Sequence, residues 1–309
     1  MSGVPNPPRH RRSFVPALAA SLLGVVLLVV PRIGPPLAPV IPLPSVEPGA
    51  VVLLAVGDIG SCDGVEDEAV ADLAARLPGT IALLGDIVYP DGSPADFADC
   101  FDPAWGSLRA RIRPAPGNHE YQTTDASGYF SYFGAAAGTP GEGWFSYDLG
   151  AWHVIVLNSN CDAVGGCGPG SPQFAWLEAD LAASGAAVPA ACTLAYWHHP
   201  RYASGRHSDD DRTAPFWNVL ATAGTDLVLA AHDHHYERLT PVDGVRSFVV
   251  GTGGRSLYEL ARPMGPHTEL RVNDSYGLLM LTLHDTSFNW RFVPAPGSTL
   301  VDTGTGQCH

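Results

Sequence analysis

The chain has 309 residues, of which 46% are hydrophobic, and it carries a formal net charge of −14. This length suits one large domain or two modest ones, and the apolar fraction is ample for a packed core. The 17 basic residues are too few for a nucleic-acid scaffold to be the main partner, because contacts with a phosphate backbone need clustered cations. A small phosphate ester is compatible with this charge if bound cations reverse the local field.

The N-terminal segment differs from the rest of the chain. Arg9, Arg11 and Arg12 precede an apolar run at 14–30, and this combination is typical of a signal peptide or a signal anchor. The run is close to the ~20 apolar residues of a membrane span, and no clear cleavage site follows it. We therefore expect residues 1–31 to form a signal peptide or, with a slight preference, an uncleaved single-span anchor. In both cases the bulk of the protein is extracytoplasmic, either secreted or membrane-anchored.

Prolines are frequent at 32–50 and predict an extended linker. The globular domain is expected at 51–293, followed by a C-terminal tail at 294–309. All six cysteines come after the apolar segment, and an even number in an exported chain predicts disulfides. Cys161 and Cys167 bracket the tight loop CDAVGGC and are the favoured pair, while Cys308 is a candidate to tie the tail. Unpaired buried thiols are the alternative.

Continuous apolar runs predict buried strands, and apolar residues at helical spacing predict amphipathic helices between them. In chain order we predict a strand at 51–58, a helix at 65–77, a strand at 80–86, partly helical structure at 93–112, a short strand and loop at 113–120, two strands at 143–159, a helix at 171–184, a strand at 192–199, a helix at 212–224, and strands at 225–232, 245–254, 276–285 and 286–294. Strand and helix alternate first, and strands dominate later. This order fits an α/β fold with two packed sheets and outer helices.

Several of these apolar strands end in polar residues of types that can bind metals. The residues at these endings are Asp58, Asp86, Asn118, His198 and His232. In open α/β sheets, binding sites form beyond the carboxyl ends of the strands, so we expect the five endings to converge. Carboxylate, amide and imidazole donors suit iron, manganese or zinc.

Short motifs surround these residues in a fixed order. They are Asp58-x-Gly60, Gly85-Asp86-x-x-Tyr89, Gly117-Asn118-His119-Glu120, His198 and His232-x-His234. One Gly-Asp pair marks an ordinary turn, but the full set resembles the calcineurin-like metallophosphoesterase superfamily, and Tyr89 is similar to the purple acid phosphatases within it. The resemblance covers residues 51–293. It implies a two-sheet mixed β-sandwich flanked by helices, a four-layer fold with a binuclear metal centre.

The resemblance also implies which side chains hold the metals. Asp58, Tyr89 and His234 would hold one ion, Asn118, His198 and His232 would hold the second, and Asp86 would bridge the two. The negative charges available at the first position predict iron(III) there, with iron(II), zinc or manganese at the second. A core aromatic without a metal is the alternative for Tyr89.

Two further histidines are candidates for catalysis. In the resembling family, the residue at the position of His119 lies over the metals, contacts the phosphoryl oxygens and is placed to protonate the leaving group. His207 follows the His198 strand, where related phosphatases place substrate-contacting histidines on a loop. An exposed loop histidine is the alternative for His207. Arg201 and Arg206 are candidates for phosphate contacts.

The other polar residues near these motifs are expected to be structural. Successive side chains at a strand end point to opposite faces. This alternation is expected to turn His235 away from the metals and to place His199 on the face opposite to His198. Residues 236–238 are expected to brace their loop. His153 alternates with apolar residues, which predicts a hydrogen-bonded core histidine.

The chain departs from the family pattern at Ala231, where the family usually has glycine before the histidine pair. A methyl group at this position requires a backbone φ that is not positive. No ligand position is changed, which argues against a degenerate, inactive domain.

These observations predict a metal-dependent phosphoric ester hydrolase that uses a binuclear centre and a metal-activated hydroxide. A phosphomonoesterase acting on a small phosphate ester is favoured. A phosphodiesterase or nucleotidase on the same centre is the first alternative, because the pocket walls set that choice. A non-catalytic, metal-bound surface protein is the second.

Overall fold

The computed structural model describes residues 43–46, 50–62, 64–187, 192–260, 262–298 and 300–309. The expected signal or anchor segment and most of the proline-rich linker lie outside these residues. Within the described ranges, no helix combines the length and the apolarity needed to cross a membrane.

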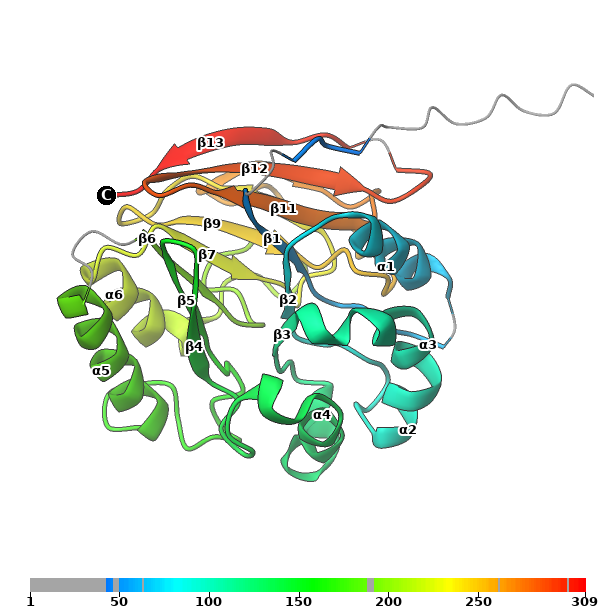
Figure 1. Cartoon of the computed structure of the whole chain (residues 1–309), viewed down its shortest axis with the longest axis horizontal. Helices are drawn as coiled ribbons and strands as arrows, with labels where there is room; N and C mark the ends of the chain where they lie inside the picture. The colour runs from blue at the N-terminus through cyan, green and yellow to red at the C-terminus, as the bar shows by residue number, and fades with distance from the viewer. Residues whose placement is uncertain (1–42, 47–49, 63, 188–191, 261, 299) are drawn as a thin grey trace, which may run out of the picture. The chain divides into compact units, whose positions relative to one another are not determined.

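One sheet has six strands in the order β13-β12-β11-β1-β2-β3 (Figure 1). Its strands are β1 (Val51–Val56), β2 (Thr80–Leu84), β3 (Ile112–Ala115), β11 (Gly277–Leu283), β12 (Ser287–Pro294) and β13 (Thr303–Gln307). The first three are parallel, and the last three add antiparallel neighbours. The segment expected to be a C-terminal tail instead supplies β13, whose run of threonines and glycines gives no apolar signal for a strand.

The second sheet has seven strands in the order β10-β8-β9-β7-β6-β5-β4. Its strands are β4 (Phe145–Leu149), β5 (Trp152–Val156), β6 (Cys192–Tyr196), β7 (Leu227–Ala230), β8 (Tyr236–Leu239), β9 (Arg246–Val250) and β10 (Thr268–Val272). The central strands β5, β6, β7 and β9 are parallel, and the outer strands are antiparallel.

Helices cover the outer face of each sheet. The helices are α1 (Glu66–Arg76), α2 (Pro94–Asp96), α3 (Asp102–Trp105), α4 (Ser127–Phe133), α5 (Pro172–Ala187) and α6 (Ala214–Thr222), and the short π or 3₁₀ turns are η1 (Phe97–Phe101), η2 (Gly106–Arg111), η3 (Glu120–Gln122), η4 (Thr124–Ala126), η5 (Gly134–Ala137) and η6 (Asp211–Thr213). Figure 1 shows α5 and α6 on the side of the sheets away from α1 and α3. Side chains from α1, α3 and α4 pack on the six-stranded sheet, and those from α5 and α6 pack on the seven-stranded sheet.

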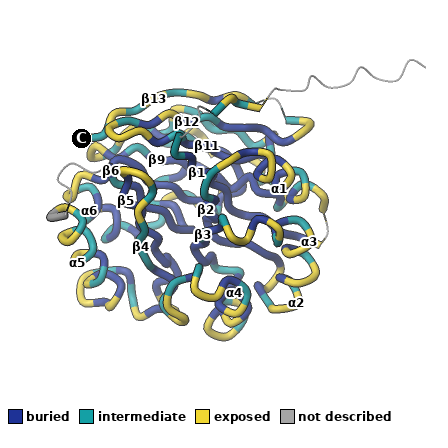
Figure 2. Tube along the Cα trace, viewed as in Figure 1, coloured by how far each residue is buried: buried dark blue, intermediate teal, exposed yellow. Residues whose placement is uncertain are grey.

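Alternation along β1 shows how the layers are built. Leu54 and Val56 join the core under α1, whereas Leu53 and Ala55 join the core between the two sheets. β1 and the other central strands of the two sheets are therefore buried on both faces (Figure 2), as their continuous apolar sequences predict. The expected four-layer fold is confirmed.

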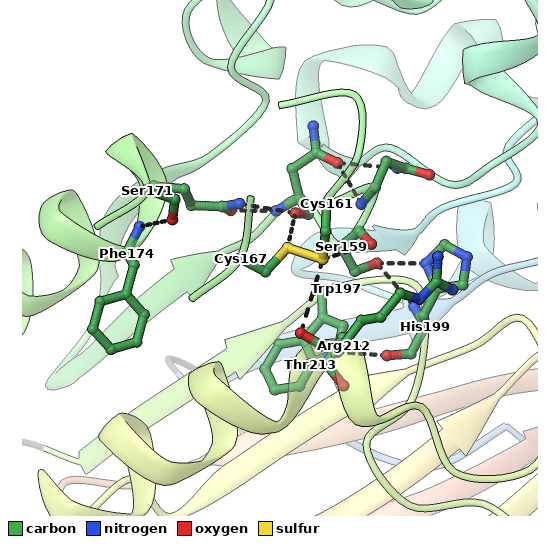
Figure 3. Close-up of a disulfide and its surroundings, with 12 residues drawn as sticks. Ser159, Cys161, Cys167, Ser171, Phe174, Trp197, His199, Arg212 and Thr213 are labelled. Carbon is green, nitrogen blue, oxygen red and sulfur yellow. Dashed lines mark hydrogen bonds between the residues drawn. A yellow bond between two sulfur atoms is a disulfide. The ribbon is translucent and has the colours of Figure 1, made fainter. Parts of the chain in front are cut away.

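The six cysteines form three disulfides: Cys62–Cys100, Cys161–Cys167 and Cys192–Cys308. The predicted Cys161–Cys167 pair is confirmed (Figure 3). Cys308 follows β13 and bonds to the first residue of β6, so this disulfide joins the two sheets. Full pairing is typical of proteins that fold outside the reducing cytosol.

His153 is the buried, hydrogen-bonded histidine that the sequence predicts. Its Nε2 lies 2.8 Å from Asp180 Oδ2 on α5, and its Nδ1 lies 3.2 Å from Asp148 Oδ1 on β4. The bond to Asp180, supported by Asp148, raises the pKa of His153 above its ordinary value. This cluster attaches α5 to the second sheet.

Candidate metal centre

Backbone hydrogen bonds join the loop after β1 to the loop after β2, and the loop after β6 to the loop after β7. The Asp58 N–H donates to the Gly85 carbonyl at 3.1 Å, and the Ala231 N–H donates to the His198 carbonyl at 2.9 Å. The loop after β3 joins them, because the His119 N–H donates to Asp86 Oδ1 at 2.8 Å. The carboxyl ends of these parallel strands therefore meet, as expected.

Three of the predicted ligands have strained backbones. Asp58, Asp86 and His232 have φ angles of 57°, 47° and 67°, in the left-handed region where a residue other than glycine costs roughly 1–3 kcal/mol. The His232 N–H donates to Asp58 Oδ2 at 2.8 Å and helps to hold two of these conformations. Such strain is concentrated at functional sites.

One group of donor atoms is formed by Asp58, Tyr89 and His234. The Tyr89 hydroxyl donates to Asp58 Oδ1 at 3.0 Å and lies 3.3 Å from His234 Nε2. His234 Nε2 lies 3.4 Å from the same Asp58 oxygen. The structure therefore brings together the three residues predicted for the first metal.

A second group is formed around His198. Its Nε2 lies 3.2 Å from Asp86 Oδ2 and 3.1 Å from His232 Nδ1. The same Asp86 oxygen lies 3.3 Å from the Tyr89 hydroxyl. Asp86 therefore contacts both groups, which is the position that a bridging ligand requires.

Asn118 is placed by its neighbours in the chain. Gly117 packs so closely against Asp86 that a Cβ at position 117 would lie 2.2 Å from the Asp86 nitrogen. On the other side, the His119 N–H binds Asp86. Asn118 Oδ1 is buried and has no hydrogen-bond partner among the described residues. Leaving such an oxygen unpaired costs about 1–3 kcal/mol, and coordination of a cation would satisfy it, so this side chain fits a metal.

Backbone carbonyls fix the orientation of two imidazoles. His198 Nδ1–H donates to the Leu84 carbonyl at 2.9 Å, and His234 Nδ1–H donates to the Ser256 carbonyl at 2.8 Å. Each ring therefore turns its Nε2 toward the carboxylates, and such a hydrogen bond from the other ring nitrogen to a carbonyl is common in histidines that bind metals. Burial lowers the pKa of His232, and it lowers the pKa of His234 to about 4, so these rings stay neutral, the form that binds metals.

The buried charges of the site favour a cation. Burial raises the pKa of Asp58 to about 8. Burial alone would also raise the pKa of Asp86, but the His198 and His119 rings hold it below the ordinary value. Burial and these two carboxylates raise the pKa of Tyr89 well above its ordinary value. The upward shifts of Asp58 and Tyr89 reflect negative charge that lacks solvation, and a bound cation would relieve it.

Glu120 supports the ligand loops and was not singled out from the sequence. Its carboxylate accepts the backbone N–H groups of Asp86 at 3.0 Å, Ile87 at 2.8 Å, Val88 at 3.3 Å and Gly117 at 2.7 Å. Burial raises its pKa to about 7. The acidic end of the Gly-Asn-His-Glu motif was the available signal for this role.

The two candidate catalytic histidines lie at the edge of the centre. The His119 ring lies 4.3 Å from the Tyr89 ring between centroids, and its Nε2 is 3.8 Å from Asp86 Oδ2. With 31% of its side chain exposed, His119 is open to a ligand. The His207 ring is exposed and lies 4.2 Å from the His232 ring.

His199 differs from the expectation, because it does not point away from the site. Its ring lies 4.5 Å from the His232 ring, and its Nδ1 is 2.8 Å from the Ser159 hydroxyl (Figure 3). Strand β6 ends at Tyr196, so strict alternation of side chains no longer applies at positions 198 and 199. Ser159 lies two residues before Cys161, whose disulfide stabilises this loop.

The remaining residues after His232 are structural, as expected. His235 is buried and its Nε2 bonds to Glu237 at 2.9 Å. Glu237 also accepts the Ser204 N–H at 2.9 Å, and Asp233 accepts the His207 N–H at 2.8 Å. These carboxylates hold the loop that carries His207.

Two further neighbours could not be identified from the sequence. The Tyr258 ring stacks on His234 at 3.9 Å with an interplanar angle of 11°. The Arg255 guanidinium lies 4.9 Å from the centre of the Tyr89 ring. Both come from an irregular loop without a motif, so only the fold places them here.

The profile of the calcineurin-like phosphoesterases matches residues 51–236, which is more than half of the chain. The protein therefore belongs to the calcineurin-like phosphoesterase family. Within it, the similarity is to the purple acid phosphatases.

Human acid phosphatase type 7 is 31% identical over 218 residues, covering 64% of this chain and 45% of that protein. Purple acid phosphatase 15 of Arabidopsis thaliana is 26% identical over 253 residues, covering 68% of this chain and 46% of that protein. The chain thus matches about half the length of these curated relatives.

Solved structures show the same fold. Purple acid phosphatase PPD1 from yellow lupin has a TM-score of 0.71 at 17% identity, covering 83% of this chain and 53% of that chain. GAP50 of Plasmodium, described as the anchor in the inner membrane complex, has a TM-score of 0.66 at 13% identity, covering 84% of this chain and 89% of that chain. A dimetal phosphatase from Danio rerio has a TM-score of 0.58 at 14% identity, covering 84% of this chain and 99% of that chain.

Proposed function

We propose that the protein is a binuclear metal-dependent hydrolase of phosphate esters, with phosphomonoesters as the preferred substrates. One observation carries this proposal. Asp86 Oδ2 lies 3.3 Å from the Tyr89 hydroxyl and 3.2 Å from His198 Nε2, so a single carboxylate oxygen is shared by the two groups of donor atoms.

The chemistry of the donor atoms supports a proposed metal for each group. Asp58, Tyr89 and His234 would hold iron(III), Asn118, His198 and His232 would hold iron(II), zinc or manganese, and Asp86 would bridge them. The phenol and the carboxylates are hard donors that favour a trivalent ion, whereas imidazoles suit a borderline divalent ion. When bound, two such ions supply Lewis-acid stabilisation of the phosphate and a water of lowered pKa.

His119 is the proposed general acid. Its Nδ1–H is engaged by the Pro90 carbonyl, which leaves Nε2 on the side of Asp86 and of the incoming substrate. A proton held at Nε2 would pass to the oxygen of the leaving alcohol as the phosphorus–oxygen bond breaks. A positioned acid of this kind contributes roughly 10²–10⁴-fold in rate.

His207 is the proposed substrate-contacting residue. It is exposed, close to His232, and fixed at its backbone by the Asp233 carboxylate. Its exposure and its distance from His232 support a role in which the imidazole would bind a phosphoryl oxygen. Because the contact is peripheral, its loss should raise KM more than it lowers kcat.

The first experiment combines metal analysis with a substrate pair. Protein purified without added metal is analysed for its elements, and hydrolysis of p-nitrophenyl phosphate is compared with hydrolysis of bis(p-nitrophenyl) phosphate. A higher kcat/KM for the monoester supports the proposal, whereas a higher value for the diester favours the phosphodiesterase alternative.

A non-catalytic role is the remaining alternative, and the similarity in fold to GAP50, described as an anchor, makes it worth testing. Asn118→Ala and His198→Ala should abolish hydrolysis while the protein remains folded. Unchanged hydrolysis in both variants, or no hydrolysis by the metal-loaded wild type, would contradict the proposed enzyme.

We propose that this hydrolase acts outside the cytoplasm, either released or held by an N-terminal anchor. The three disulfides support an exported protein. Separating membrane from soluble fractions, followed by N-terminal sequencing of the mature chain, tests which form exists.

A further inference from the structure

A cavity of about 510 Å³ adjoins the candidate metal centre. It is lined by Gly205, Arg206, Leu257, Tyr258, Glu259 and Arg262. Tyr258 also stacks on His234, so its ring forms a wall between the cavity and the centre. With a phosphate at the metals, the part of the substrate beyond the reacting ester would extend toward this cavity.

The cavity has an excess of positive charge in an acidic chain that contains no lysine. Arg206 and Arg262 line it against a single carboxylate, that of Glu259. Neither arginine forms an ion pair with any residue that the structure describes, whereas Arg201 and Arg212 pair with aspartates at 3.0 and 2.6 Å. The guanidinium of Arg206 instead lies 5.0 Å from the centre of the Tyr258 ring. Both cations are therefore available to an anion.

Arg271 joins the two loops that carry these arginines. Its Nη2 donates to the Arg262 carbonyl at 2.8 Å, and its Nη1 donates to the Ser204 carbonyl and, at 3.0 Å, to the Ser204 hydroxyl. Ser204 is fixed in turn by Glu237. The backbones near Arg206 and at Arg262 are therefore held relative to each other, which reduces the entropy lost when both bind one ligand.

A second cavity, of about 320 Å³, shares Arg262 with the first. Much of its lining is apolar and includes Tyr202, Leu239, Pro263 and Pro266. This space would accept the organic part of a substrate that extends past the arginines.

We propose that Arg206 and Arg262 bind a second phosphate of the substrate, so that small molecules carrying two phosphate groups are preferred over those carrying one. This inference rests on the proposed phosphomonoesterase function. Water adds to the phosphorus held at the centre, the ester bond breaks, and the leaving alcohol takes one proton. Inorganic phosphate and a monophosphate alcohol are the products, and the phosphate at the arginines is not cleaved in that turnover.

Symmetric substrates give the sharpest test. Alkane-α,ω-diol bisphosphates of three to six carbons are compared with the matching monophosphates, after correction for the two equivalent ends. We expect the bisphosphates to have at least a tenfold higher kcat/KM at low salt, with one chain length preferred. The preference should decrease as ionic strength rises, because exposed charges are screened.

Substitutions show whether the preference for bisphosphates depends on Arg206 and Arg262 or only on the net charge of the protein. Arg206→Ala and Arg262→Ala should each lower the ratio of kcat/KM between bisphosphate and monophosphate by about tenfold, the usual effect of one charge-assisted hydrogen bond. Glu259→Gln removes the opposing carboxylate and should raise the ratio. Arg76→Ala removes an exposed charge at the end of α1 and should leave it unchanged.

The outcomes distinguish the two proposals. Equal ratios in wild type and in both arginine variants overturn the second-phosphate site and leave the phosphomonoesterase intact. If neither substrate releases phosphate from the metal-loaded protein, the proposed function itself fails.

Discussion

Gly57 and Ala231 are in close contact where the two sheets meet. A Cβ on Gly57 would lie 2.5 Å from the Ala231 Cβ, so the methyl group of one residue occupies the space that the other leaves. Ala231 is the position where the chain departs from the family pattern, and its φ is not positive, as its methyl group requires. The absence of a side chain at Gly57 accommodates this departure.

Gly57→Ala should therefore destabilise the protein by about 1–3 kcal/mol, the usual cost of overpacking a core. The double variant Gly57→Ala/Ala231→Gly should recover part of that loss, because it restores the space for one methyl group. Urea unfolding of the wild type, the two single variants and the double variant measures how far the effects of the two substitutions on the free energy of unfolding depend on each other. If the two substitutions change the free energy of unfolding additively, the contact between positions 57 and 231 is not the cause of the destabilisation.

Asn118→Ala should change metal binding without reducing the stability of the metal-free protein. The Asn118 Oδ1 has no partner among the described residues, so its removal breaks no hydrogen bond there. Metal should raise the Tm of the wild type, since a ligand that binds only the folded state stabilises it, and this rise should be smaller in the variant. A lower Tm of the metal-free variant, with an unchanged rise on adding metal, would identify Asn118 as structural.

Tyr89→Phe should abolish the visible charge-transfer absorption expected of a phenolate bound to iron(III). Tyr258→Phe is the matched control, because this ring stacks on His234 without belonging to the proposed ligand set. Absorption spectra and iron content of the three proteins are compared after loading with iron. A band that persists in Tyr89→Phe, or is absent from iron-loaded wild type, contradicts the assignment.

His153→Gln should reduce stability in a pH-dependent manner. The carboxylates of Asp180 and Asp148 raise the pKa of His153 in the folded state, so its contribution is fully present below the ordinary pKa of about 6.5. That contribution is lost as pH rises through the raised value. The difference in free energy of unfolding between wild type and variant should therefore be larger at pH 5.5 than at pH 9.

Urea titrations of metal-free protein measure this difference. His284→Gln is the control, because His284 bonds to the Asn289 amide rather than to a carboxylate. Comparison of the two variants shows whether a pH-dependent loss of stability is specific to the histidine that lies between carboxylates. A difference for His153→Gln that is constant with pH would show that the imidazole stays neutral in its pocket.

The layers of the fold could be predicted from the sequence, because strands buried on both faces require continuous apolar runs. Strand β1 is the clearest case, with Leu53 and Leu54 facing different cores. Strands β8, β10 and β13 were not predicted. Their sequences, YERL, TELRV and TGTGQ, lack such runs, and pairing with neighbouring strands places them in the sheets.

The candidate ligands could be predicted because each follows a buried strand within a short motif. Contacts that depend on the folded loops could not. Tyr258 reaches His234 from a segment without regular structure, and His199 turns toward His232 because β6 has already ended. Glu120 lies within a recognised motif, but its four backbone partners are set by the three-dimensional course of two loops.

The Cys192–Cys308 bond has a consequence for a site that it does not touch. Asp86 follows a strand of one sheet and His198 follows a strand of the other, so sliding between the sheets would alter the distance between them. The disulfide fastens the start of β6 to the opposite sheet, one strand length from His198, and so limits that sliding. Reductants should therefore weaken metal retention even though no cysteine is a ligand.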